Sequence, residues 1–173
     1  MCGIIGINSN KPVSVTIINS LKKLEYRGYD SAGIATLSSG LINEIKSEGR
    51  VDNLEKNSLV QNMQGTIGIG HVRWATHGSP NSINAHPHSS LNVSVVHNGI
   101  IENSTLLKKL LVSKGHKFKS QTDTEVIVHL ITEHLKTENI VNSIKKTLKS
   151  LQGSFALGIL FKDEPDLIVG ARR

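Results

Sequence analysis

The sequence has a single cysteine, which lies at position 2, directly after Met1 and before the apolar run of MCGIIG. If Met1 is removed, Cys2 carries a thiol and a free α-amine on the same residue. An α-amine titrates near about 7.7–8.0, so part of it is unprotonated at neutral pH and is able to accept the thiol proton. Cys2 is therefore a candidate nucleophile, and the alternative is an incidental cysteine in a buried strand.

The stretch HVRWATHGSP gathers a fixed cation, an indole, a hydroxyl and an imidazole at Arg73, Trp74, Thr76 and His77. The planar guanidinium of arginine suits bidentate binding of a carboxylate. The alternative is a polar surface loop. The glycine-rich segment just before it is not a P-loop, because no Gly-Lys-Ser/Thr follows it.

Asn98 and Gly99 lie between two apolar runs in VVHNGIIEN. Asn-Gly in this setting predicts a hairpin with a type I′ turn. The same two residues also suit an oxyanion hole, in which the Asn98 amide and the Gly99 N–H point at a tetrahedral oxyanion.

Asp123 lies in QTDTEVI, where Thr122 and Glu125 have the spacing of a capping box. On this segment alone we expect Asp123 to favour a helix N-terminus, although its carboxylate also suits a ligand ammonium. The eight histidines show no zinc-binding spacing, and the one cysteine adds no cluster. We expect neither a metal nor a cofactor.

Periodicity and turn residues predict a mixture of strands and helices around these residues. The expected strands cover residues 3–9, 31–37, 41–47, 65–74, 91–103, 154–161 and 166–171, and the expected helices cover 14–26, 53–63, 104–115, 122–135 and 139–153. Ser14 is the expected N-cap of the first helix, and Gly115 the expected end of the third. This order favours sheets and helices packed in layers over a doubly wound parallel sheet.

Length, composition and charge indicate which classes of protein can be excluded. The length fits one domain, and no apolar run approaches the roughly 20 residues of a membrane span. The N-terminal residues lack the basic and apolar regions of a signal peptide, and a lone cysteine agrees with a reducing cytoplasm, so we expect a cytoplasmic protein. The net charge of +6 comes mostly from lysines on helical surfaces, and aromatics make up only 3%, so we expect neither a nucleic-acid nor a membrane partner. The charge does not exclude binding of an anionic ligand such as a sugar phosphate.

Six stretches, in this order, resemble one family. The chain is similar to the glutaminase domain of glucosamine-6-phosphate synthases, the isomerizing glutamine–fructose-6-phosphate aminotransferases, in MCGIIG, LEYRGYDSAGIA, HVRWATHG, NAHPH, VVHNGIIEN and TDTEVI. The resemblance implies an α+β fold, the four-layer αββα sandwich of the N-terminal-nucleophile hydrolases.

The resemblance also implies catalytic roles. Cys2 would attack the side-chain amide of L-glutamine, with its own α-amine as the base. Asn98 and Gly99 would form the oxyanion hole. Arg27 would help to organise the region around the nucleophile.

Substrate-binding roles follow from the same resemblance. Arg73 would hold the carboxylate of glutamine, and Asp123 its ammonium. Trp74, Thr76 and His77 would belong to a loop that closes over the substrate. The reaction would run through a thioester and yield glutamate and ammonia.

Residues 1–173 are expected to form this glutaminase domain alone, incomplete on its C-terminal side because DLIVGARR stops in or just after a strand. The resemblance implies isomerase domains that use the ammonia and that partner this domain in a homo-oligomeric full-length enzyme, and we expect these domains to be absent from this chain. We therefore expect hydrolysis of glutamine without amination of a sugar. The alternatives are a catalytically silent module of the same fold and a glutaminase domain that serves another acceptor.

Overall fold

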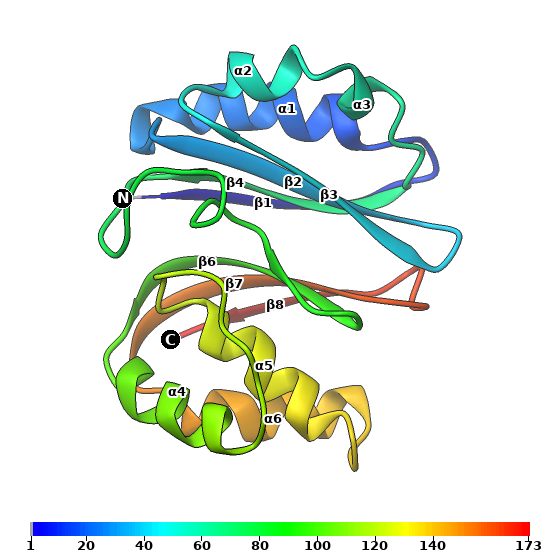
Figure 1. Cartoon of the computed structure of the whole chain (residues 1–173). Coiled ribbons are helices and arrows are strands. Elements are labelled where there is room, and N and C mark those ends of the chain that lie inside the picture. The colour runs from blue at the N-terminus through cyan, green and yellow to red at the C-terminus, as the bar shows by residue number, and fades with distance from the viewer. Residues whose placement is uncertain (1) are drawn as a thin grey trace.

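A computed structural model describes residues 2–173; the expected removal of Met1 concerns a residue outside this range. The chain folds into four layers, in which two antiparallel sheets face each other and helices cover both outer faces (Figure 1). Every helix in the described part of the chain is too short or too polar to cross a bilayer.

The first sheet and its helices come from the first half of the chain. The strand order is β1–β4–β2–β3, with β1 (Gly3–Asn8), β2 (Ser31–Ser38), β3 (Leu41–Glu48) and β4 (Ile67–Arg73). The outer helices are α1 (Ser14–Leu24), the 3-10 turn Glu25–Arg27, α2 (Val51–Glu55) and α3 (Ser58–Gln61).

The second sheet and its helices come from the second half. The strand order is β5–β6–β7–β8, with β5 (His88–Ser89), β6 (Val93–Ile101), β7 (Gly153–Phe161) and β8 (Ile168–Arg172). The outer helices are α4 (Ser104–Ser113), α5 (Glu125–His134) and α6 (Ile140–Ser150).

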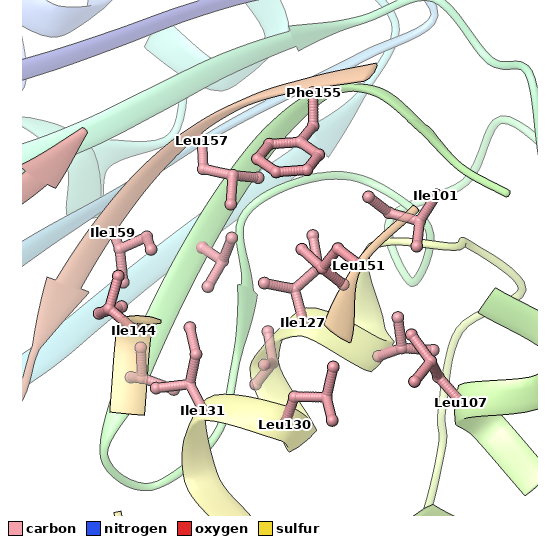
Figure 2. Close-up of a cluster of buried hydrophobic side chains, with 14 of the residues drawn as sticks. Ile101, Leu107, Ile127, Leu130, Ile131, Ile144, Leu151, Phe155, Leu157 and Ile159 are labelled. Carbon is pink, nitrogen blue, oxygen red and sulfur yellow. The ribbon is translucent and has the colours of Figure 1, made fainter. Parts of the chain in front are cut away.

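Three apolar clusters hold the four layers together. One lies between α1–α3 and the first sheet, and another, drawn in Figure 2, lies between α4–α6 and the second sheet. The third joins the two sheets through residues such as Ile69 of β4 and Val96 of β6. Because β4 is covered on both faces, all seven of its residues are buried, which is why its sequence lacks strict alternation.

Several local expectations were wrong. Asn98 and Gly99 do not form a hairpin turn, because both lie within β6 and pair with Ala156 and Phe155 of β7. Ser14 does not cap α1 through its side chain, since its hydroxyl donates to the carbonyl of Met63. The helix expected over 53–63 is two short helices, because the side chain of Asn57 caps a new start.

Candidate active site

The predicted nucleophile lies where two neighbouring strands of the first sheet meet the second sheet. Gly3 of β1 pairs with Val72 of β4, so Cys2 lies beside the end of β4. The Cys2 Sγ accepts a hydrogen bond from the backbone N–H of Trp74 at 3.3 Å. Pairing of these strands therefore fixes the position of the thiol.

The backbone of Cys2 is fixed by two of the predicted site residues. The Arg27 side chain donates from Nε to the Cys2 carbonyl at 3.0 Å, and the Asn98 amide donates to the same oxygen at 3.2 Å. Gly28 lies so close to the Arg73–Trp74 peptide that a Cβ there would come within 2.5 Å of the Arg73 carbonyl. The YRG segment can therefore approach the thiol only with a glycine next to Arg27.

Gly99 gives β6 a local distortion beside Asn98. Its φ is +144°, and a Cβ would lie 2.1 Å from the carbonyl oxygen of Ser154. L-residues rarely adopt this backbone conformation. The Asn-Gly pair thus marks a special backbone position, within a strand instead of at a turn.

The loop after β4 folds back onto the Arg73 guanidinium. Arg73 is 3% exposed and donates to the carbonyls of His77, Gly78 and Ser79, the last at 3.2 Å. Its Nη1 also lies 3.8 Å from an oxygen of Asp30. In this conformation the guanidinium holds the 77–79 backbone over the site.

Asp30, Asn84 and Gln121, for which the sequence predicts no role, anchor this loop. The Asp30 carboxylate accepts from the backbone N–H of Ala75. The Asn84 amide donates to the Ser79 carbonyl at 2.9 Å and to Gln121 Oε1 at 3.0 Å. Asp30 and Asn84 lie inside the quoted stretches LEYRGYDSAGIA and NAHPH, but nothing in their spacing indicates that they meet the loop.

Asp123 is not a helix-capping residue. Its carboxylate accepts from the backbone N–H of Ile101 at 2.7 Å, which ties it to the end of β6. The expected capping box is also absent, since Thr122 Oγ1 contacts the His88 ring and Glu125 accepts from the backbone of Lys119 and Ser120. Helix α5 makes no side-chain cap at Thr124.

Most of the predicted residues line one small cavity. Its volume is about 20 Å³, and it is lined by Cys2, Arg73, Trp74, Thr76, His77, His86, His97, Gly99, Thr122, Asp123 and Thr124. Asn98 and Arg27 do not line the cavity, but their side chains donate hydrogen bonds to the carbonyl of Cys2. A cavity of this size holds about one water molecule. A larger open cavity of about 420 Å³ lies elsewhere, beside Glu44, Lys46 and Lys119.

Trp74, Thr76 and His77 are all exposed to solvent on this loop. Trp74 is 50% exposed and packs edge-to-face against Tyr29, with ring centroids 6.0 Å apart. Thr76 Oγ1 lies 3.2 Å from His77 Nδ1. The Trp74 indole therefore lies on the outside of the loop, while the backbone N–H of Trp74 contacts the Cys2 thiol.

Burial dominates the electrostatics of the site. It raises the pKa of the Cys2 thiol above 9.0, against the opposing hydrogen bond from Trp74. Burial also lowers the pKa of His71 to about 3 and that of His97 to about 4. The thiol is thus protonated at neutral pH and requires a base, whereas these imidazoles are neutral.

The described residues contain no group of three or more His, Cys, Asp or Glu side chains arranged to hold a metal ion. The buried histidines contact hydroxyls and each other instead: the rings of His71 and His86 stack with centroids 4.1 Å apart. The arrangement around Cys2 combines a thiol, amide and backbone donors, a guanidinium and a carboxylate. Such a set can bind a zwitterion and attack a carbonyl carbon.

Comparison with protein families gives a match over more than half of the chain. A family model described as a glutamine amidotransferase domain matches residues 71–173. This range includes Arg73, Asn98, Gly99 and Asp123, and it leaves out Cys2.

Curated relatives match along the whole chain. The glutamine–fructose-6-phosphate aminotransferase (isomerizing) of Mesorhizobium japonicum is 53% identical over 99% of this chain and 28% of its own length. Its namesakes from Clostridium acetobutylicum and Brucella abortus are 51% and 49% identical over all of this chain and 29% of theirs. The chain thus spans less than a third of these relatives.

Solved structures share the fold. A glutamine phosphoribosylpyrophosphate amidotransferase from B. subtilis has a TM-score of 0.86 and 28% identity, over 99% of this chain and 37% of that one. A glutamine aminotransferase class-II domain protein from Silicibacter pomeroyi has a TM-score of 0.68 and 12% identity, over 99% of this chain and 76% of that one, which supports the fold alone. The expected α+β sandwich of the N-terminal-nucleophile type is confirmed.

Proposed function

The chain belongs to the glutamine amidotransferase domain family, and from this premise we propose that it hydrolyses L-glutamine to glutamate and ammonia with Cys2 as the nucleophile. One observation carries the proposal. The Cys2 thiol lines the same small cavity as Arg73, Gly99 and Asp123, although these residues are far apart in the sequence.

The proposed substrate contacts follow from charge. Glutamine presents a carboxylate, an ammonium and an amide. The Arg73 guanidinium suits the carboxylate and the Asp123 carboxylate suits the ammonium, because each pairs opposite charges in a buried site. The Asn98 amide, which contacts the Cys2 carbonyl, and the N–H of Gly99, which lines the cavity, suit the amide oxygen.

The proposed reaction has two halves. After removal of Met1, the Cys2 α-amine accepts the thiol proton, and the thiolate attacks the amide carbon to form a tetrahedral oxyanion. Donors at Asn98 and Gly99 stabilise that oxyanion. The α-ammonium returns the proton to the leaving nitrogen, ammonia departs, and a thioester to Cys2 remains. Water then attacks the thioester, releasing glutamate and restoring the thiol.

Substrate entry requires the loop over the site to move. A cavity of about 20 Å³ does not hold an amino acid, and carbonyls of residues 77–79 already occupy Arg73 donors. We infer that Trp74, Thr76 and His77 move outward with the loop and close again over bound glutamine. Closure then excludes water and retains ammonia.

The destination of the ammonia is a further proposal. The similar aminotransferases are named for fructose 6-phosphate, so we propose that a longer protein containing this domain delivers ammonia to that sugar phosphate through isomerase domains, as a cytoplasmic homo-oligomer. The alternatives are another acceptor and a catalytically silent module.

Intact mass and product analysis test the proposal together. We expect the purified protein to lack Met1 and to release glutamate from glutamine, and Cys2→Ala to release none. Full retention of Met1 in an active preparation, or glutamate release by Cys2→Ala at the wild-type rate, would place the nucleophile elsewhere. A preparation without Met1 that releases no glutamate would favour the silent module.

A further inference from the structure

Three consecutive side chains attach the chain at Asp123 to two other segments, residues 86–88 and strand β6. Asp123 itself accepts from the Ile101 N–H at the end of β6. Before it, Thr122 Oγ1 lies 3.0 Å from His88 Nε2 at the start of β5. After it, Thr124 Oγ1 contacts both His86 and His97. The proposed ammonium-binding carboxylate is therefore held from both sides.

The Thr124 hydroxyl is the centre of a buried chain of hydrogen bonds, His86–Thr124–His97, called the relay below. Its Oγ1 lies 2.8 Å from His86 Nε2 and 2.8 Å from His97 Nδ1, and all three residues are at most 4% exposed. A hydroxyl has one proton, so it donates to one ring and accepts from the N–H of the other. The two imidazoles must therefore present opposite faces, one a bare nitrogen and one an N–H.

The charge of Asp123 selects the direction of this relay. His97 lines the cavity together with Asp123, and its Nε2 is buried with no hydrogen-bond partner among the described residues. Asp123 lines the same cavity and its charge raises the pKa of His97 against burial, so we expect the ring proton on Nε2. His97 Nδ1 is then bare and accepts from Thr124, and Thr124 accepts from the Nε2–H of His86.

The relay connects the two ends of the proposed substrate. His97 directly precedes Asn98 and Gly99 on β6, whereas Thr124 directly follows Asp123. We propose that Thr124 is a positioning residue, whose hydroxyl sets the place of the Asp123 carboxylate relative to the oxyanion donors Asn98 and Gly99. This inference rests on the proposed glutaminase function, because it concerns how that site binds its substrate.

Removal of the hydroxyl tests the inference. Thr124→Val keeps the shape of the side chain and leaves two buried ring nitrogens without a partner. We expect kcat/KM for glutamine to fall about tenfold, mainly through KM, and Thr124→Ser to retain a value within about threefold of wild type. Thr124→Ser that loses as much as a folded Thr124→Val would contradict the proposal, and so would a wild-type KM in the valine variant.

A matched control separates positioning from general packing. Thr147 on α6 is 1% exposed and its hydroxyl has no partner in the described chain, so Thr147→Val should leave kcat/KM within about twofold of wild type. An equal loss in Thr147→Val would indicate that any buried threonine is needed, against the proposal.

A double-mutant cycle identifies the residue through which Thr124 acts. In an Asp123→Asn background, Thr124→Val should change kcat/KM by less than about twofold, because the carboxylate to be positioned is already gone. The same tenfold loss in both backgrounds would show that Thr124 does not act through Asp123.

The ring tautomers give a readout that needs neither activity nor a variant. Nitrogen-15 shifts of the wild-type protein should show His97 protonated at Nε2 and His86 protonated at Nε2. His97 protonated at Nδ1 would overturn the relay as assigned. Failure of the wild type to hydrolyse glutamine would instead overturn the proposed function, so the two failures are distinguishable.

Discussion

Single residues of the site depend on backbone geometry as much as on side-chain chemistry. Cys2 owes its place to strand pairing and to donors on its carbonyl, and Gly99 has a backbone conformation that a side chain would oppose. The residue types indicated the chemistry from the sequence alone. Their geometry could not be inferred, because Asn-Gly between apolar runs suits a turn and a distorted strand equally well.

Gly99→Ala should destabilise the protein by about 3 kcal/mol or more, because it adds a strained φ and a clash with the Ser154 carbonyl. Urea unfolding measures the change. Gly170→Ala in β8 is the control, since a Cβ there meets nothing within 4 Å. Equal stability of the two variants would contradict the geometry described for β6.

Arg73→Lys should raise KM for glutamine about tenfold, because one ammonium cannot reproduce the two parallel bonds of a guanidinium to a carboxylate. Steady-state kinetics measure this. Arg50→Lys changes an exposed arginine outside the cavity and should keep the wild-type KM. A wild-type KM in Arg73→Lys would remove Arg73 from its proposed role.

At the scale of elements, periodicity predicted the helices and strands well, since most lie within a few residues of their expected ranges. The wrong predictions concern polar residues at the ends of helices. Ser14 and Thr122 have the spacing of caps, yet their hydroxyls make tertiary hydrogen bonds, and Glu125 accepts from the backbone of Lys119 and Ser120 before the helix. Residue spacing indicates only contacts within a few residues along the chain. It therefore does not predict that the Asn84 side chain bonds to Ser79 and Gln121.

Asn84→Ala should loosen the loop after β4, because it removes the amide that joins Ser79 to Gln121. We expect faster amide hydrogen exchange in residues 74–80 than in wild type. Ser82→Ala is the matched control, since the Ser82 side chain is exposed and makes no hydrogen bond within the described chain. Unchanged exchange in Asn84→Ala would show that other contacts hold the loop.

At the scale of the whole molecule, the buried histidines between the layers affect the dependence of stability on pH. Burial is the main cause that lowers the pKa of His71 and His88 from 6.5 to about 3, and that of His97 to about 4. The charge of Arg73 also lowers the pKa of His71 and His88, and Asp123 opposes the shift at His97. The unfolded chain therefore binds more protons than the fold below about pH 6.5.

Stability should accordingly fall as the pH falls from 7 to 5, by about 2 kcal/mol for each of these histidines. Urea unfolding at several pH values measures the slope. His88→Gln should make the slope shallower by one histidine's share, whatever its effect at pH 7. A stability that stays flat from pH 7 to 5 would mean that these imidazoles are protonated in the fold.

The central claim is that Cys2 is the nucleophile of an amide-hydrolysing site. The most direct measurement is peptide mass spectrometry after treatment with a glutamine analogue that carries an electrophilic carbon at the amide position. We predict one adduct per chain, on the Cys2 of protein that has lost Met1, with excess glutamine slowing its formation. Absence of the adduct, its presence on another residue, or equal labelling of Cys2→Ala would contradict the account.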